Sequence, residues 1–145
     1  MYNKRFPVLK LITKTNCMES MKKIARITLG LILLVYGANH FFDNFLGLPS
    51  MPAEAQEILI SMGYWLMYVK LFEMLVAIAL LSNRFVPLAL LVLAPISLNI
   101  LTFHILYDLR GIIPGLLVAV LTAFLIYQHF DFYRPFLQRN AHMEI

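Results

Sequence analysis

The sequence has little charge and only one cysteine. Of its 145 residues, 14% are charged, whereas soluble domains carry about 25%, and 61% are hydrophobic. A soluble fold of this length cannot bury so much apolar surface, so most of it is expected to face lipid. The lone Cys17 excludes an internal disulfide and a Cys-x-x-Cys redox pair within one chain.

The sequence also lacks the spacing patterns of several functional classes. It contains no dinucleotide-binding fingerprint and no metal-ligand spacing, so we predict no metal site. Its basic residues flank an apolar segment, where membrane topology and anionic lipid account for them. Nucleic acid is therefore not an expected partner.

Four segments are long and apolar enough to cross a membrane, which takes about 20 mainly apolar residues. They are residues 24–42, 64–81, 85–107 and 111–130. We therefore predict an all-α fold, an integral membrane four-helix bundle. We expect a basic cytoplasmic N-terminal tail at residues 1–23, a four-helix domain at 24–130, and a cytoplasmic C-terminal tail at 131–145.

The basic residues predict the orientation of the four spans. If all four cross the membrane, ten basic residues fall on one side, whereas the opposite side has only Arg110. Basic flanking residues favour the cytoplasmic side, so both termini are expected there. The ten residues are Lys4, Arg5, Lys10, Lys14, Lys22, Lys23, Arg26, Arg84, Arg134 and Arg139.

The long outer connection between the first two spans, which starts at Asp43, contains a further helical pattern. Ser50 is a suitable N-cap and Gly63 a suitable end. The pattern predicts a short amphipathic helix lying on the outer membrane surface or capping the bundle. Its apolar face consists of Ala55, Ile58, Leu59 and Met62, and its polar face consists of Glu54, Glu57 and Ser61.

The polar residues of the spans gather in the outer half of the bilayer. At about 1.5 Å per helical residue, Glu73 lies near mid-membrane, and Asn99 lies about 12 Å from the outer end of its span. An ionisable group inside a membrane costs at least about 2.5–3.5 kcal/mol on insertion scales and normally faces the bundle interior. The candidates for ligand binding or proton handling are Glu73, Lys70, Asn99, His104, Asn39 and His40.

Lys70 and Glu73 are three residues apart, so they share a helix face and can pair. Two interpretations fit this spacing. The residues form either a structural ion pair that fixes the rotation of their helix, or a carboxylate site that handles a proton or a ligand in an outward-facing pocket. Pro95 can kink the third span and open space beside Asn99, whose amide can then bond Glu73 or a ligand carbonyl.

His40 and His104 lie near the predicted outer interface, where two roles are open to a histidine. Each side chain either meets water and headgroups, or it binds a ligand or relays a proton, since imidazole titrates near neutral pH. Haem is not expected, because axial ligation needs opposed histidines at matched depth and nothing else in the sequence demands haem.

Several short motifs occur together in a characteristic order. A stretch from Arg26 to Gly37 enters the first span, and Asn39-His40 follows it. The later motifs are Lys70-Leu71-Phe72-Glu73, which reads K-x-x-E, Leu80-Leu81-Ser82-Asn83-Arg84, and Pro95-Ile96-Ser97-Leu98-Asn99-Ile100, which leads to Phe103-His104. Over residues 24–137 the chain resembles the DoxX and DoxX-like family of small four-helix bacterial membrane proteins.

The resemblance implies a location and a class of function. The family is named for a subunit associated with a thiosulfate:quinone oxidoreductase, and other members are linked to oxidative-stress or sulfur-redox assemblies. It implies a redox-associated subunit of the bacterial cytoplasmic (inner) membrane. Together with the polar cluster of Glu73, Asn99 and His104, it predicts that the protein binds a quinone or other lipophilic small molecule in an outward-facing polar pocket. The expected partners are the lipid bilayer, a membrane or redox protein and further copies of the chain in a homo-oligomer.

Two other functions remain open from the sequence. The protein is alternatively a non-catalytic scaffold or assembly subunit, in which the polar cluster only locks helix packing. The third alternative is a small transporter or lipid-handling protein, although four helices are few for a transporter and no inverted repeat is visible. No catalytic residue is identified, and stand-alone enzyme activity is not expected.

Overall fold

The computed structural model describes residues 5–42 and 44–137, with side chains from residue 17 to residue 136 apart from residue 43. This part of the chain is helical and contains no strand, which confirms the all-α prediction. Lys4, Asp43 and Arg139, on which the sequence analysis drew, lie outside the described residues. The elements are α1 (Arg5–Phe41), α2 (Ala53–Met62), α3 (Tyr64–Leu81), α4 (Val86–Tyr107), the 3-10 turn η1 (Leu109–Gly111), α5 (Ile112–Gln128) and α6 (Phe130–Leu137).

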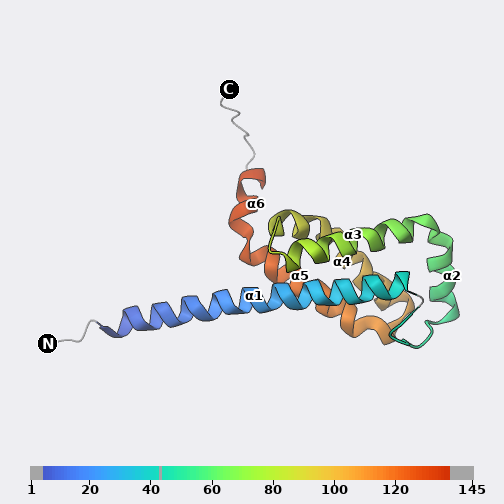
Figure 1. Ribbon diagram of the computed structural model, residues 1–145, viewed down its shortest axis with the longest axis horizontal. Helices are drawn as coiled ribbons and strands as arrows, with labels where there is room; N and C mark the ends of the chain where they lie inside the picture. Colours follow the sequence, from blue (N-terminus) through green and yellow to red (C-terminus); the bar gives the residue numbers. More distant parts are fainter. Residues whose placement is uncertain (1–4, 43, 138–145) are drawn as a thin grey trace, which may run out of the picture.

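Four of these helices are long and apolar enough to cross a membrane, as the sequence predicts. The candidate spans are Cys17–Phe41, Tyr64–Leu81, Val86–Tyr107 and Leu109–Gln128. Helix α1 packs against α3 and α5, and α4 packs against the same two helices, so α1 and α4 are diagonally opposed in the bundle. Figure 1 shows the four helices running side by side, with α2 across one end of the bundle and α6 at the other. We refer to these ends as the α2 end and the α6 end.

The predicted ends of the third and fourth spans differ from the structure by a few residues. Phe85 does not begin α4 but precedes it, with a φ of 53° that a helix interior excludes. Helix α5 ends at Gln128, because the chain turns at His129 and starts α6. The sequence analysis treated this last segment only as a tail. It contains the aromatic residues Phe130, Phe132 and Phe136, all of which are exposed.

Helix α1 is much longer than its membrane-spanning part. It begins at Arg5, so residues 5–23, which the sequence analysis treated as a tail, continue the helix of the first span. Its 37 residues extend for about 55 Å at 1.5 Å per residue, whereas the hydrocarbon core of a bilayer is about 30 Å thick. Figure 1 shows the first part of α1 projecting beyond the α6 end of the bundle.

The core of the bundle is a column of leucines with small residues where helices approach closely. The fully buried leucines are Leu29, Leu33, Leu80, Leu90, Leu93 and Leu125. A Cβ added at Gly30 would lie 2.9 Å from Leu81 Cγ, and one added at Gly37 would lie 2.8 Å from Met74 Cγ. These two glycines therefore allow α1 to pack closely along α3, as small residues commonly do between membrane helices.

Helix α2 has the amphipathic pattern that the sequence predicts. Ala55 is buried, and Ile58, Leu59 and Met62 are partly buried, whereas Glu54, Glu57 and Ser61 are exposed. Its start differs from the prediction, because Pro52 rather than Ser50 occupies the N-cap position and no side chain caps the helix. Proline supplies the backbone angle for this entry without needing a hydrogen-bond donor.

Candidate functional site

Lys70 and Glu73 form an ion pair inside the membrane-spanning part of α3. Lys70 Nζ donates to Glu73 Oε2 at 2.9 Å and to Oε1 at 3.1 Å. The Glu73 side chain is 2% exposed, and the Lys70 side chain is 22% exposed. The carboxylate is thus closed off by packing, while the ammonium is the member of the pair that a ligand can reach.

The pair lies at the crossing of α1 and α3. At Gly37 the α1 backbone passes close to Met74, and a Cβ there would lie 3.9 Å from the Lys70 carbonyl oxygen. His40 follows Gly37 by one turn on α1 and is exposed. The helix that packs against the pair therefore carries a histidine one turn beyond the crossing.

The electrostatics make the two charges of the pair mutually dependent. Among the described residues, Lys70 is the only one that hydrogen-bonds the Glu73 carboxylate. A charge buried without a partner is strongly unfavourable, so loss of Lys70 would leave Glu73 uncompensated. In return, the two contacts to Glu73 leave one N–H of the ammonium, which has three, for another acceptor.

A second polar pair lies at the same end of the bundle, where α4 turns into α5. His104 Nδ1 is 3.4 Å from Asp108 Oδ2 and 3.3 Å from the Asp108 carbonyl oxygen. Both oxygens are acceptors, so a proton on Nδ1 can be donated to either of them. Asp108 is 5% exposed, and its Oδ1 has no hydrogen-bond partner within the part of the chain that the structure describes.

Two glycines make room for the His104 ring. A Cβ added at Gly111 would lie 2.3 Å from His104 Cε1, and one at Gly115 would lie 2.9 Å from Cδ2. No other residue type fits either position without displacing the ring. The sequence analysis did not identify Asp108 as a member of this site. The spacing of four residues from His104 is the signal that could have indicated the pair.

Asn99 and Asn39 do not join the Lys70–Glu73 pair. Asn99 is exposed on α4, and the buried polar residue of that region is Ser97, which bonds the Ala94 carbonyl. Asn39 Nδ2 donates to Asn44 Oδ1 at 3.1 Å, and Asn39 Oδ1 accepts from the Leu46 N–H at 2.9 Å. Asn39 therefore orders the loop after α1 rather than lining a site with Glu73.

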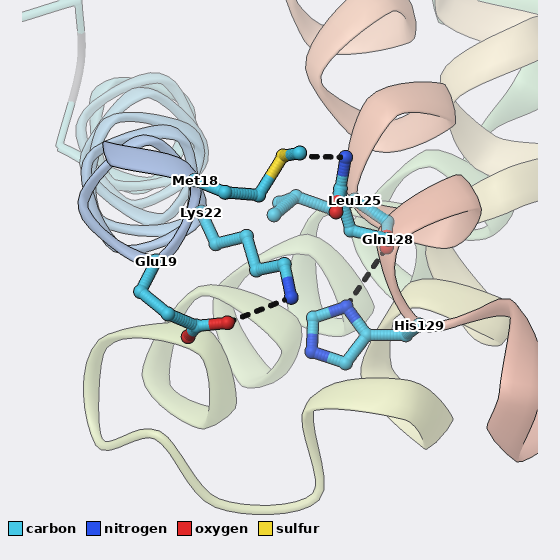
Figure 2. Close-up of polar contacts among 6 residues, drawn as sticks. All are labelled: Met18, Glu19, Lys22, Leu125, Gln128 and His129. Carbon is cyan, nitrogen blue, oxygen red and sulfur yellow. Dashed lines mark hydrogen bonds and ion pairs between the residues drawn. The ribbon is translucent and has the colours of Figure 1, made fainter. Parts of the chain in front are cut away.

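One polar contact at the α6 end joins α1 to α5, and two others are local. Lys22 pairs with Glu19 at 3.0 Å, and Gln128 Nε2 lies 3.7 Å from Met18 Sδ, so α1 touches the end of α5 (Figure 2). His129 Nδ1 bonds the Leu125 carbonyl at 2.8 Å, and Figure 2 shows its ring beside the Lys22 side chain.

Two further contacts at the α6 end join helices that are distant in sequence. Arg26 on α1 donates to the Leu80 carbonyl in the last turn of α3. Tyr133 on α6 donates to the Pro87 carbonyl at 2.7 Å, and burial raises the pKa of its phenol. These contacts place the described ends of the chain, in α1 and α6, on the same side of the bundle.

Of three comparisons with known proteins, one identifies a family. No curated protein and no solved structure matches the chain. Residues 21–105 match the profile of the family described as DoxX. The matched region contains Lys70, Glu73, Asn99 and His104 and ends before Asp108. Because the match covers more than half of a chain with four apolar helices that could cross a membrane, the protein belongs to the DoxX family of multi-pass membrane proteins.

Proposed function

We propose that the protein is a redox-associated membrane subunit that binds a quinone, or a similar lipophilic carbonyl compound, beside Lys70. The observation that carries the proposal is the asymmetric burial of the pair, with Glu73 2% and Lys70 22% exposed. A carboxylate closed off in this way holds an ammonium in place and leaves it one hydrogen for a ligand acceptor.

The chemistry of the pair favours a neutral ligand with a carbonyl oxygen. The ion pair has no net charge, so an anionic ligand would add an uncompensated charge inside the bilayer. A hydrogen bond from an ammonium to a carbonyl is charge-assisted and stronger than a bond between neutral groups. In this proposal His40, one turn beyond Gly37 on α1, supplies a second polar contact to the same ligand. A quinone combines such carbonyls with an apolar body that partitions into lipid.

The redox role requires a partner protein. The single cysteine of the chain excludes an internal dithiol, and no group of three or more metal-ligating side chains occurs in the described ranges. In the proposed function this protein holds the quinone, and a membrane or redox protein exchanges electrons with it. The membership of the DoxX family supports this assignment.

We also propose that the α6 end faces the cytoplasm of a bacterial cell and that the α2 end faces outward. The described ends of the chain flank the same side of the bundle, where Lys22, Lys23, Arg26 and Arg84 gather. Basic flanking residues favour the cytoplasmic side of a membrane. The Lys70 site then opens toward the outer leaflet.

A second function is favoured by the completeness of the Lys70–Glu73 pair. Both carboxylate oxygens accept hydrogen bonds from the same ammonium, as in a structural ion pair that fixes helix rotation. In this alternative the protein is a scaffold or assembly subunit without a ligand, and replacement of the pair costs only stability.

The experiment is native mass spectrometry with lipid extraction on gently purified protein. Wild type should carry a quinone, and Lys70→Met and Glu73→Gln should lose it. The matched control is Lys22→Met, which removes a lysine from another pair spaced three residues apart, at the opposite end of the bundle. His40→Gln tests the site at an exposed position and should reduce quinone occupancy.

Two results would decide against quinone binding. The first is wild type without any bound quinone after mild extraction. The second is equal quinone occupancy in all variants, including Glu73→Gln. A co-purifying protein that stays bound in every variant, together with lower stability of Lys70→Met, would support the scaffold function instead.

A further inference from the structure

Two polar side chains of α4 face away from the bundle inside the membrane-spanning segment. Asn99 and Thr102 are both exposed, and neither has a hydrogen-bond partner among the residues that the structure describes. Asn99 lies about 12 Å from Tyr107, the end of the span, at 1.5 Å per residue. Lipid chains cannot hydrogen-bond a carboxamide at this depth, and polar groups in membranes normally face protein.

These residues belong to a regular stripe on the outer face of α4. The bundle-facing stripe is Val86, Leu90, Leu93 and Ser97, all buried. The opposite stripe is displaced from it by two residues, or about 200° around a helix with 3.6 residues per turn. It consists of Leu88, Val92, Pro95, Asn99, Thr102 and Leu106, all exposed. We call it the outer α4 stripe.

The spacing of the outer α4 stripe alternates between four and three residues. This is the heptad pattern that lets two helices pack along a common seam. In such a seam Asn99 takes the position at which a single asparagine fixes the register of a parallel pair. A helix that faced only lipid would have no reason to place its polar residues on this repeat.

The backbone adds a third unsatisfied polar group beside the outer α4 stripe. Pro95 lies inside α4 and has no N–H, so the Leu91 carbonyl lacks its usual donor four residues later. Leu91 is itself exposed. The carbonyl, the amide and the hydroxyl therefore lie on neighbouring turns of one lipid-facing surface.

Helix α5 shows what a purely lipid-facing surface looks like in this protein. Its exposed residues in the interior of the span are apolar, and they are Ile113, Leu116, Leu117, Val120 and Ala123. The polar Thr122 of α5, in contrast to Asn99 of α4, is buried, and its hydroxyl donates to the Val118 carbonyl at 2.7 Å. The exposed amide of α4 is thus not a general property of the outer surface.

We infer that the outer α4 stripe is the interface of a homodimer, in which a second copy of this chain packs α4 against α4. Two copies in one membrane have the same orientation, so a twofold axis along the membrane normal makes the helices parallel and places Asn99 opposite Asn99. A carboxamide has both donors and an acceptor. Each amide can therefore donate to the other, and this self-complementarity identifies a second copy as the occupant.

The inference goes beyond the proposed function and does not depend on it. The stripe is on α4, diagonally opposed to α1, which carries His40. Loss of quinone binding in a Lys70 variant would leave the dimer unchanged, and loss of the dimer in an Asn99 variant would leave the Lys70–Glu73 pair intact.

Disulfide cross-linking in native membranes tests the seam directly. In a Cys17→Ser background, Val92→Cys and Leu106→Cys place one thiol on the stripe, and Val120→Cys places one on the lipid-facing surface of α5 as a matched control. Mild oxidation should cross-link the two stripe variants within minutes and the control only at the rate of random collision. Equal rates at all three positions would overturn the inference.

The role of Asn99 is tested in the Val92→Cys background. Asn99→Leu should weaken self-association about threefold to thirtyfold, the range expected for one interhelical hydrogen bond in a membrane. Asn99→Gln keeps the amide and should retain most of the cross-linking. The Asn99→Leu monomer should fold normally, because the change makes an exposed lipid-facing position more apolar, and helical content by circular dichroism checks this.

Two further outcomes would contradict the dimer. One is an unchanged association constant in Asn99→Leu, measured by dilution of the labelled protein in bilayers. The other is a monomeric wild type in native mass spectra whose Asn99 surface is occupied by a different protein or by a bound small molecule.

Discussion

Lys70 Nζ lies 2.9 Å from Glu73 Oε2 on the same face of α3, and the lysine is the more exposed of the two. The carboxylate is buried and its only hydrogen-bond partner among the described residues is this ammonium. In the proposed site a ligand would therefore contact Lys70 rather than Glu73.

Replacing Lys70 alone should destabilise the protein more than replacing both members of the pair. Lys70→Met leaves a buried carboxylate without a partner. Breaking a buried ion pair in this way lowers the free energy of unfolding by about 3–5 kcal/mol, and we expect a loss at the lower end because Lys70 is partly exposed. Glu73→Gln combined with Lys70→Met removes the uncompensated charge and should recover part of this loss. Unfolding in lipid or detergent measures both. Additive effects would show that the pair is not energetically coupled.

Gly111→Ala should disturb the His104–Asp108 pair more than Gly115→Ala does. The new Cβ would lie 2.3 Å from His104 Cε1 at position 111 but 2.9 Å from Cδ2 at position 115. Overpacking of this kind costs about 1–3 kcal/mol, and the larger overlap should cost more. Thermal unfolding of the two variants gives the order, and the reverse order would contradict the ring position.

Tyr133 should make stability sensitive to high pH. Burial raises the pKa of its phenol above the ordinary value of 10.0, so the folded state holds this proton more tightly than the unfolded state does. The resulting stabilisation is complete below pH 10 and is lost as the pH rises through the folded-state pKa. Unfolding of wild type and Tyr133→Phe at pH 8 and pH 11 should show a smaller pH dependence in the variant.

The hydroxyl of Tyr133 should also stabilise the protein at neutral pH. Its bond to the Pro87 carbonyl, at 2.7 Å, joins α6 to the start of α4. Removal of the hydroxyl in Tyr133→Phe should cost about 0.5–1.5 kcal/mol. A variant as stable as wild type at pH 8 would mean that α6 is not held to the bundle by this bond.

Cys17 provides a direct test of orientation. It is the only cysteine of the chain and is exposed on the part of α1 at the α6 end. If the α6 end is cytoplasmic, a membrane-impermeant maleimide should label Cys17 only after the cells are permeabilised. An added cysteine at Glu57, on the exposed face of α2, should be labelled in intact cells. Labelling of Cys17 in intact cells would reverse the proposed topology.

The sequence predicts the number of candidate membrane spans and the ion pair well for physical reasons. Long apolar runs bounded by turns are a strong signal, and the second predicted span coincides with α3 from residue 64 to residue 81. A separation of three residues places Lys70 and Glu73 on one helix face, so their contact depends only on local geometry. Both features are set within one segment and need no knowledge of the neighbouring helices.

The rotation of α4 could not be predicted in the same way. Apolar residues occur on every side of this helix, so hydrophobicity does not indicate which face packs inward. The rule that polar residues face the interior places Asn99 beside Glu73, but the structure buries Ser97 and exposes Asn99. The four-residue spacing could have indicated the His104–Asp108 pair, but not the packing of its ring, which depends on Gly111 in η1 and Gly115 in α5.

The most direct test of the account is the dissociation constant of a short-chain ubiquinone for the protein in nanodiscs. Charge-assisted hydrogen bonds contribute about 1.5–3 kcal/mol, so Lys70→Met should weaken binding about tenfold to 150-fold. The Lys22→Met control should bind as wild type does. Saturable binding that depends on Lys70 supports the quinone site, whereas no saturable binding to wild type, or equal constants for all three proteins, would contradict it.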